Sequence, residues 1–206
     1  MTRQLLLERL HVTDLSIGII LGSTRPGRKG EQVAKWVLEQ AAKRDDAQFD
    51  LIDLLDYNLP HLDEAVPPSM QQYANEHTKA WSKTIDAYDG FVIVTPEYNR
   101  SPSGALKNAM DFLYKEWNNK AVGFVSYGAQ ASGLRAVEHL RQIAGELQLA
   151  DVRTAVGISL ITDFEQFSVM KPVPHHEPTL STMLDQLVAW SGALRGVRES
   201  AALAAA

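Results

Sequence analysis

Short runs of apolar residues alternate along the chain with segments in which apolar residues recur every three or four positions. The apolar runs predict β-strands, and they occupy residues 15–21, 49–52, 91–95, 121–126 and 152–158. The run at 91–95 (FVIVT) is mostly β-branched, which is typical of a central strand buried on both faces.

The segments between and after these runs have helical periodicity. Helical spacing starts after Gly30 and returns in four later segments, at residues 73–88, 104–113, 134–147 and 180–188. Strands that alternate with helices predict a parallel sheet covered on both faces, because each parallel connection needs a crossover. Right-handed crossovers leave the doubly wound topologies, so we expect an α/β fold.

The same pattern predicts the domain boundaries. No internal repeat or low-complexity linker divides the chain, so residues 15–196 predict one domain. We expect residues 1–14 to be an N-terminal extension, since their apolar stretch Leu5–Leu7 is too short for a signal peptide. The alanine-rich residues 197–206 predict a flexible tail.

Composition narrows the class of protein. The 206 residues are 45% hydrophobic and 22% charged, which is ordinary for a globular protein with a core. A net charge of −5 without a basic patch argues against a nucleic-acid partner. The lack of cysteine excludes a disulfide framework and a cysteine nucleophile, and it is compatible with the cytoplasm, where we expect the protein. No apolar run approaches the roughly 20 residues of a membrane span, so we expect no membrane partner.

The loop after the first predicted strand has the composition of an anion site. It reads GSTRPGRKG from Gly22 to Gly30 and ends where the first helix begins. Its glycines let backbone N–H groups approach an anion, Ser23 adds a hydroxyl, and Arg25 and Arg28 add positive charge. The helix that follows adds the positive end of its dipole. We interpret the loop as a phosphate cradle; the alternative is a flexible polar surface turn.

The spacing within this loop distinguishes kinds of phosphate ligand. Gly22 and Gly27 have the Walker A spacing, but Arg28 replaces the lysine and Lys29 replaces the Ser or Thr that binds Mg²⁺. The G-x-G-x-x-G pattern of dinucleotide sites does not follow the first strand. The loop provides for one phosphate group, which favours a mononucleotide such as FMN.

Two further loops leave the carboxyl ends of predicted strands, where open α/β sheets bind ligands. TPEYNRSPSG follows the strand at 91–95; its prolines fix the backbone direction, and Tyr98 can line a flat ring. SYGAQASG follows the strand at 121–126, and its small residues allow a flat ligand to approach the backbone. Taken singly, the first is also a rigid turn in which Ser103 caps the next helix, and the second is also an ordinary turn.

The three loops, in this order and on these strands, resemble the NADPH-dependent FMN reductase family of the flavodoxin-like superfamily. The resemblance spans residues 15–158 and rests on three motifs, GSTRPGRKG, PEYNRSPSGALKNAMDFL and SYGAQASGLRAVEHLRQ. It implies a three-layer sandwich around a five-stranded parallel sheet of strand order 2-1-3-4-5. It also implies a homodimer or homotetramer, for which the helix at 106–113 and the loop at 53–69 are candidate contact surfaces.

The resemblance further implies a cofactor and its site. FMN is the expected cofactor, with NADPH or NADH as the hydride donor. Its phosphate would bind the first loop, through Ser23, Arg25, Arg28, Gly30 and Gln32. Its ring would lie against Pro96, Glu97, Tyr98 and Asn99, with Ser126, Tyr127, Gly128 and Gly133 near its other edge. Glu31 departs from the family, where Ser and Asn are frequent at this point, and it suits a phosphate site only if its side chain points away.

The reaction that the resemblance implies is hydride transfer from the nicotinamide to flavin N5, followed by two-electron reduction of a quinone, flavin, azo dye or other small acceptor. Such a cycle needs no protein nucleophile and no metal, so we expect no catalytic side chain. A flavodoxin-type electron carrier and a flavin-free binding protein are the alternatives that the fold leaves open. We interpret His175–His176 as an exposed loop pair rather than a metal site.

Overall fold

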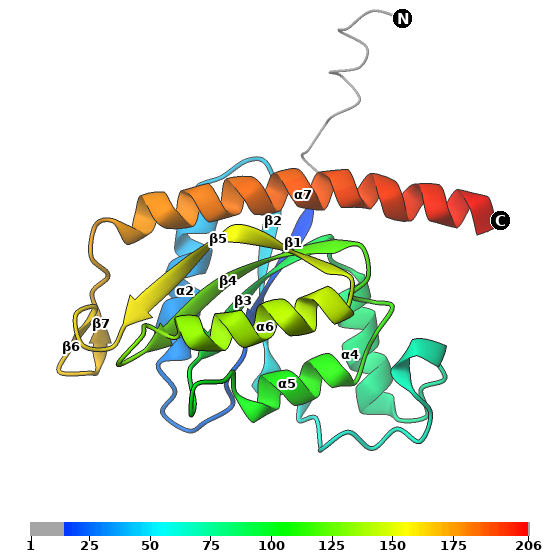
Figure 1. Ribbon diagram of the computed structural model, residues 1–206, viewed down its shortest axis with the longest axis horizontal. Helices are drawn as coiled ribbons and strands as arrows, with labels where there is room; N and C mark the ends of the chain where they lie inside the picture. Colours follow the sequence, from blue (N-terminus) through cyan, green and yellow to red (C-terminus); the bar gives the residue numbers. More distant parts are fainter. Residues whose placement is uncertain (1–14, 206) are drawn as a thin grey trace, which may run out of the picture.

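Five parallel strands form a single sheet at the centre of the molecule (Figure 1). The computed structural model describes residues 15–205, so the expected extension 1–14 lies outside the described residues. The strand order β2-β1-β3-β4-β5 confirms the predicted 2-1-3-4-5 topology. The strands are β1 (Ser16–Leu21), β2 (Gln48–Asp53), β3 (Gly90–Pro96), β4 (Lys120–Gly128) and β5 (Leu149–Ser159).

Helices cover both faces of this sheet and complete the predicted three-layer sandwich (Figure 1). One layer consists of α2 (Gly30–Ala41) and α7 (His176–Ala205), and the other of α4 (Glu76–Asp86), α5 (Gly104–Asp111) and α6 (Leu134–Glu146). The connection from β2 to α4 contains the short helices α3 (Leu54–Tyr57) and η2 (Pro68–Met70). None of the described helices is both long enough and apolar enough to cross a membrane.

Side chains of the central strands alternate between the two layers. On β1, Ile17, Ile19 and Leu21 pack toward α2 and α7, whereas Ile20 belongs to the opposite core. Every residue of β3 is buried, which agrees with the central position predicted for residues 91–95. A strand that is apolar at successive positions needs cover on both sides, because its side chains point alternately to the two faces.

The last helix is longer than the sequence indicated. Periodicity predicted a helix over 180–188 and a flexible tail over 197–206, but α7 runs without a break from His176 to Ala205. Alanine has the highest helix propensity, which favours continuing the helix through the alanine-rich end. Arg198 ties this part to the sheet by donating to the backbone oxygen of Asn119 at 2.7 Å. The mobility of the tail stays a prediction.

A small hairpin, β6 (Phe164–Glu165) and β7 (Val169–Met170), lies between β5 and α7. Asp163 fixes its base, since Oδ1 accepts hydrogen bonds from the backbone N–H of Val173 at 2.9 Å and from His176 Nε2 at 3.1 Å. Burial alone raises the pKa of Asp163, but these bonds and the Ser159 N–H together hold the pKa below its ordinary value. His176 is buried, so the expectation of an exposed histidine pair was wrong for this residue.

Candidate functional site

The three loops singled out in the sequence meet at the carboxyl ends of β1, β3 and β4, which are neighbours in the sheet. The Ser23 hydroxyl lies 3.0 Å from the Tyr98 hydroxyl and so joins the first loop to the second. Ser103 adds a second link, because its Oγ donates to the carbonyl of Gly22 and accepts from the N–H of Leu106 at 3.1 Å. This confirms Ser103 as the N-cap of α5. The loops therefore form one connected surface.

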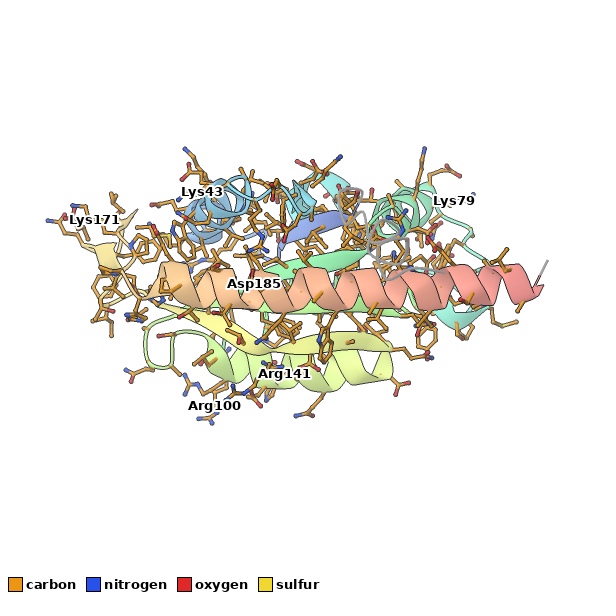
Figure 2. The ribbon with its side chains drawn as sticks, turned by 90° about the horizontal axis from the view of Figure 1, so that it is seen from above. Lys43, Lys79, Arg100, Arg141, Lys171 and Asp185 are labelled. Atoms are coloured by element: carbon orange, nitrogen blue, oxygen red, sulfur yellow. The ribbon has the colours of Figure 1, made fainter. Side chains whose placement is uncertain are left out.

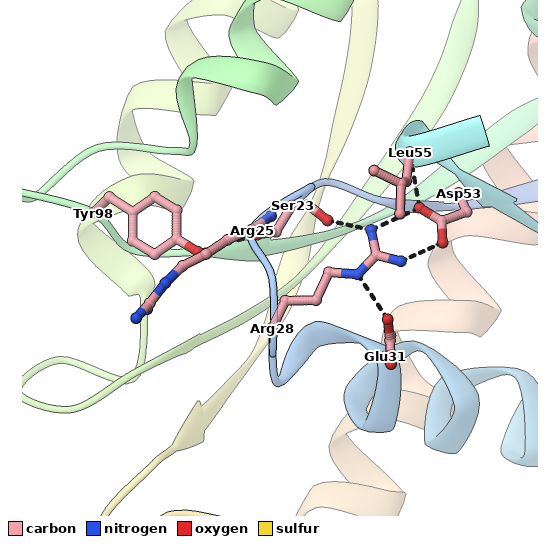
Figure 3. A network of polar contacts seen from close by, with 7 residues as sticks. All are labelled: Ser23, Arg25, Arg28, Glu31, Asp53, Leu55 and Tyr98. Carbon is pink, nitrogen blue, oxygen red and sulfur yellow. Dashed lines mark hydrogen bonds and ion pairs between the residues drawn. The ribbon is translucent and has the colours of Figure 1, made fainter. Parts of the chain in front are cut away.

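Arg28 fixes the shape of the first loop (Figure 3). Its guanidinium binds both carboxylate oxygens of Asp53, at 2.8 and 2.5 Å, and donates to the backbone oxygen of Ser23 at 2.5 Å. Nε donates to Glu31 at 3.0 Å. Because the Arg28 side chain is 5% exposed and its donors are engaged within the chain, its position differs from the phosphate-facing one that the resemblance implied.

Arg25 and the start of α2 are the positive groups of the first loop that could bind an anion. The Arg25 side chain is exposed, extends beside Tyr98 in Figure 3, and has no side-chain partner among the residues that the structure describes. Lys29 occupies the N-cap position of α2 but forms no side-chain hydrogen bond to the first turn. The Gln32 N–H bonds to the Lys29 carbonyl at 3.1 Å, so the first turn of α2 offers an anion its dipole and the N–H groups ahead of Gln32.

Gln32, expected to face a phosphate, instead binds the hairpin. Its amide nitrogen donates to the backbone oxygen of Ser168 at 2.8 Å, and its amide oxygen accepts from the N–H of Met170 at 2.8 Å. The side chain of Glu31 turns toward Arg28, which removes the conflict expected between this carboxylate and a phosphate. Thus both residues after Gly30 serve to hold neighbouring segments in place.

The second loop contains a two-residue turn. The backbone groups of Tyr98 and Ser101 bond to each other at 2.9 and 3.1 Å, and the two residues between them, Asn99 and Arg100, have φ of 50° and 71°. The Glu97 N–H donates to the Tyr127 carbonyl at 3.1 Å, which joins this loop to the third. The Glu97 carboxylate is buried and paired with Arg135 at the start of α6. Pro96, the last residue of β3, is buried.

The third loop allows backbone to approach closely. Gly133 has φ of 81°, and a Cβ there would lie 2.7 Å from the backbone nitrogen of Tyr127. A Cβ on Gly128 would lie 2.9 Å from the nitrogen of Gly133, so both glycines are required by space. The Ser126 hydroxyl closes the loop by donating to the carbonyl of Ser132 at 2.9 Å.

Tyr127 connects the third loop to α2, the helix that follows the first loop. Its hydroxyl is buried beside the Ser23 hydroxyl and the backbone N–H of Gly30. Burial raises the pKa of Tyr127. A Cβ on Gly30 would lie 2.7 Å from this hydroxyl, so the glycine at the start of α2 makes room for the tyrosine. Gly30 therefore sets the distance between two of the loops.

Sequence reasoning missed the partners that hold the loops in place. Asp53, at the end of β2, binds Arg28, and Arg135 and His139 on α6 bind Glu97 and Ser101, the latter at 3.0 Å. These residues lie 25 or more positions from their partners, as with Asp53 and Arg28, and follow no motif spacing. The sequence offered one signal for these partners: strands that neighbour β1 and β3 in a parallel sheet must end near the loops that leave β1 and β3.

Known proteins are similar to this chain in sequence. The model of the NADPH-dependent FMN reductase family matches residues 15–163. The chain is 43% identical over 156 residues to the NAD(P)H-dependent FMN reductase ntnL of Nectria sp, a match that covers 71% of this chain and 77% of that protein. It is 31% identical over 145 residues to the 2-hydroxy-1,4-benzoquinone reductase of Burkholderia sp, covering 66% and 73% of the two chains.

A solved structure extends the likeness to the fold. The flavoenzyme NAD(P)H:(acceptor) oxidoreductase FerB of Paracoccus denitrificans superposes with a TM-score of 0.66 at 21% identity, over 86% of this chain and 97% of that one. The sheet order defines a flavodoxin-like fold. The chain belongs to the NADPH-dependent FMN reductase family. It is an oxidoreductase that uses FMN and NAD(P)H, and not a carrier without its own activity.

The residues present at the loops fit FMN. The uncapped first turn of α2 and the exposed Arg25 suit its phosphate. Gly128 and Gly133 pack tightly against the chain and fix the third loop, whose tip at Ala129 and Gln130 is exposed beside the turn that follows Tyr98. The buried Tyr127 hydroxyl adds a polar group beside the start of α2.

Proposed function

We propose that this enzyme holds FMN across the carboxyl edge of its sheet and reduces quinone-type acceptors at the expense of NAD(P)H. The observation that carries the proposal is the joining of the three loops through Ser23, Tyr98 and Tyr127 into one surface with an open positive end. When bound, FMN takes a hydride from the nicotinamide and passes two electrons to the acceptor.

The side chains divide into those that bind the cofactor and those that hold the loops. We assign phosphate binding to Ser23, Arg25 and the N–H groups that begin at Gly30, because Arg25 is exposed without an ion pair among the described residues and the first turn of α2 has no side-chain cap. We assign the ring to the backbone from Pro96 to Asn99 and to the loop from Ser126 to Gly133. Arg28, Gln32 and Glu97 act behind this surface, where each engages another segment.

Among the possible acceptors, the name of a relative and the chemistry of quinone reduction favour a quinone. The Burkholderia relative carries the name of a benzoquinone reductase, and it matches about two thirds of this chain. A quinone takes two electrons and two protons without forming a bond to the protein, so it needs a flat apolar slot rather than a nucleophile. Tyr98, partly buried between the first and second loops, supplies an aromatic wall for such a slot.

Anaerobic absorbance spectroscopy tests this proposal. We expect NADPH to bleach the flavin band of FMN-loaded protein and a benzoquinone to restore it. Steady-state kcat/KM for a benzoquinone should exceed kcat/KM for an azo dye and for free FMN by about tenfold or more, a difference of about 1.4 kcal/mol in transition-state binding. A higher kcat/KM for the azo dye or free FMN would refute the quinone assignment. Protein that binds no FMN would refute the site itself.

We infer that the chain forms a homodimer or homotetramer through the connection from β2 to α4. Met110 and Leu113 of the other candidate surface are buried in the core, so of the two candidate surfaces the connection is the one with exposed large apolar side chains. Leu55, Leu62 and Met70 are 53%, 42% and 56% exposed. A second copy is the occupant that would remove this apolar area from water. Light scattering should give a multiple of 22.8 kDa, and Leu55→Lys should shift it toward the monomer.

A cytoplasmic location completes the proposal. The cysteine-free sequence supports it, because proteins of oxidising compartments are frequently stabilised by disulfides. Cell fractionation followed by immunodetection tests it, and recovery of the protein in an extracellular or membrane fraction would refute it.

A further inference from the structure

Arg100 occupies a turn position whose backbone geometry is unfavourable for a residue other than glycine. Asn99 and Arg100 both have positive φ, at 50° and 71°, and they connect the paired residues Tyr98 and Ser101. A two-residue turn of this kind favours Asn followed by Gly, since L side chains strain the backbone at positive φ. Asn99 suits its position, but arginine stands where glycine would relieve the strain. A strained non-glycine residue beside a ligand site suggests that its side chain has a function.

The turn is fixed at three points, so the base of Arg100 cannot easily move. Glu97 pairs with Arg135, the Ser101 hydroxyl lies 3.0 Å from His139 Nδ1, and the Tyr98 hydroxyl lies 3.0 Å from Ser23. Figure 2 shows Arg100 at the outer margin of the molecule, beside the start of α6. A charged group on a fixed base is preorganised for binding, because little freedom is lost when a ligand arrives.

The charge of Arg100 is not neutralised by the described part of the chain. Two other guanidinium groups around the loops, those of Arg28 and Arg135, pair with Asp53 and Glu97 respectively. For Arg100, as for Arg25, no ion pair occurs among the described residues. This matters in a chain with a net charge of −5, where carboxylates outnumber cations. Arg25 lies on the first loop at the proposed FMN phosphate, so Arg100 on the second loop is available to a different anion.

We propose that Arg100 binds the 2′-phosphate of NADPH and gives the enzyme a preference for NADPH over NADH. The inference rests on the proposed function, since it assumes that the nicotinamide donor enters over these loops. NADPH differs from NADH only in that phosphate. A guanidinium binds phosphate oxygens through two parallel N–H donors, and arginine is the usual residue at 2′-phosphate sites. The strain at position 100 is then the consequence of keeping this donor at the tip of a fixed turn.

The variant Arg100→Gly tests the proposal, because it removes the guanidinium and relaxes the backbone at once. We expect KM for NADPH to rise about tenfold while KM for NADH and kcat with both donors stay within about twofold. Titration with NADP⁺ and NAD⁺, followed by flavin fluorescence, should show the same loss for NADP⁺ alone. The melting temperature should rise by about 2 °C, since the strain is gone. Arg100→Lys should recover part of the NADPH preference.

The control is Arg153→Ala, which removes an exposed arginine from the middle of β5. It should leave the ratio of KM values unchanged, so that loss of one positive charge alone is excluded as the cause. An equal rise of KM for both donors in Arg100→Gly would show contact with a group that they share and would overturn the 2′-phosphate assignment. An unchanged ratio would also overturn it. If neither donor bleaches the wild-type flavin, the proposed function itself fails.

Discussion

The two edges of the sheet use charged residues in opposite ways. At the amino edge, Asp89 accepts from the Ser16 N–H at 3.1 Å and pairs with Arg198 on α7. At the carboxyl edge, Arg25 and Arg100 are exposed and have no ion pair among the described residues. One edge satisfies its charges within the chain and stabilises the fold. The other also pairs charges, such as Arg28 with Asp53, but it leaves Arg25 on a glycine-containing loop and Arg100 on a strained turn for anionic ligands.

Lys120, at the start of β4, is the clearest example of the first use. Its ammonium is buried and donates to the backbone oxygens of Ile85 and Asp86, at 2.7 and 3.2 Å, at the end of α4. These carbonyls lie at the negative end of the helix, where a cation is favourable. Burial nevertheless lowers the pKa of Lys120 to about 8, so the lysine retains a desolvation cost at neutral pH.

The largest expected effect comes from a glycine at the carboxyl edge. Gly133→Ala places a Cβ 2.7 Å from backbone and side-chain atoms of residues 126 and 127, at φ of 81°. Clash and strain together should lower the free energy of unfolding by about 3 kcal/mol. FMN affinity should fall at the same time, because the third loop must move. Urea denaturation and FMN titration measure the two losses.

Gly145→Ala is the matched control for this change. Gly145 lies near the end of α6, and a Cβ there meets no atom within 4 Å. Alanine favours a helix over glycine by about 0.8 kcal/mol, so the control should stabilise the protein and leave FMN binding intact. Equal behaviour of the two variants would refute the view that space at Gly133 is needed for the loop.

The next largest effect concerns Asp53, which holds Arg28 and so shapes the first loop. Asp53→Ala removes the two-pronged partner of Arg28, whose side chain is 5% exposed, and leaves a nearly buried charge without its main partner. We expect a loss of about 2 kcal/mol of unfolding free energy, together with weaker FMN binding. Glu31→Ala removes the exposed partner of the same arginine and should cost at most about 0.5 kcal/mol. Equal losses for the two variants in urea denaturation would contradict this ranking.

At the amino edge, the lowered pKa of Lys120 predicts a dependence of stability on pH. Between about pH 8 and the ordinary pKa of lysine, the unfolded chain binds one proton more than the folded chain at this residue. Stability should therefore rise with pH, by about 1.5 kcal/mol between pH 8 and 9.5. Lys120→Met should abolish this rise. A wild-type stability that falls over this range as steeply as the variant's would refute the assignment.

The central strands and the loops that follow them could be predicted because their signals are local. Residues 91–95 are apolar at nearly every position, and the PEYN motif directly follows them. The roles of Arg28 and Gln32 could not be predicted, since their partners Asp53 and Ser168 come from distant segments that only the folded sheet brings near. Composition alone marked Arg28 as a ligand-facing cation, whereas its burial beside a carboxylate makes it a structural one.

The same limits apply near the end of the chain. Alanine-rich residues have no apolar periodicity, so the sequence did not indicate that α7 continues through residues 197–205, although alanine favours a helix. His176 lies in a sequence rich in proline and histidine that reads as a surface loop. Its burial depends on Asp163, which the hairpin places 3.1 Å from the ring. The contact between Asp163 and His176 has no spacing that a single sequence could indicate.

The smallest expected effect concerns the two arginines of the first loop, which differ in how their loss changes flavin affinity rather than stability. Arg25→Ala should weaken FMN binding about tenfold, or about 1.4 kcal/mol, because an exposed cation facing one phosphate is lost. Riboflavin lacks that phosphate, so its affinity should not change in this variant. Arg28→Ala should instead weaken riboflavin and FMN alike, since it disorganises the loop itself and leaves Asp53 without its partner. Titration of both flavins into both variants therefore distinguishes a ligand contact from a structural one. Equal losses of riboflavin and FMN in Arg25→Ala would show that this arginine, too, is structural.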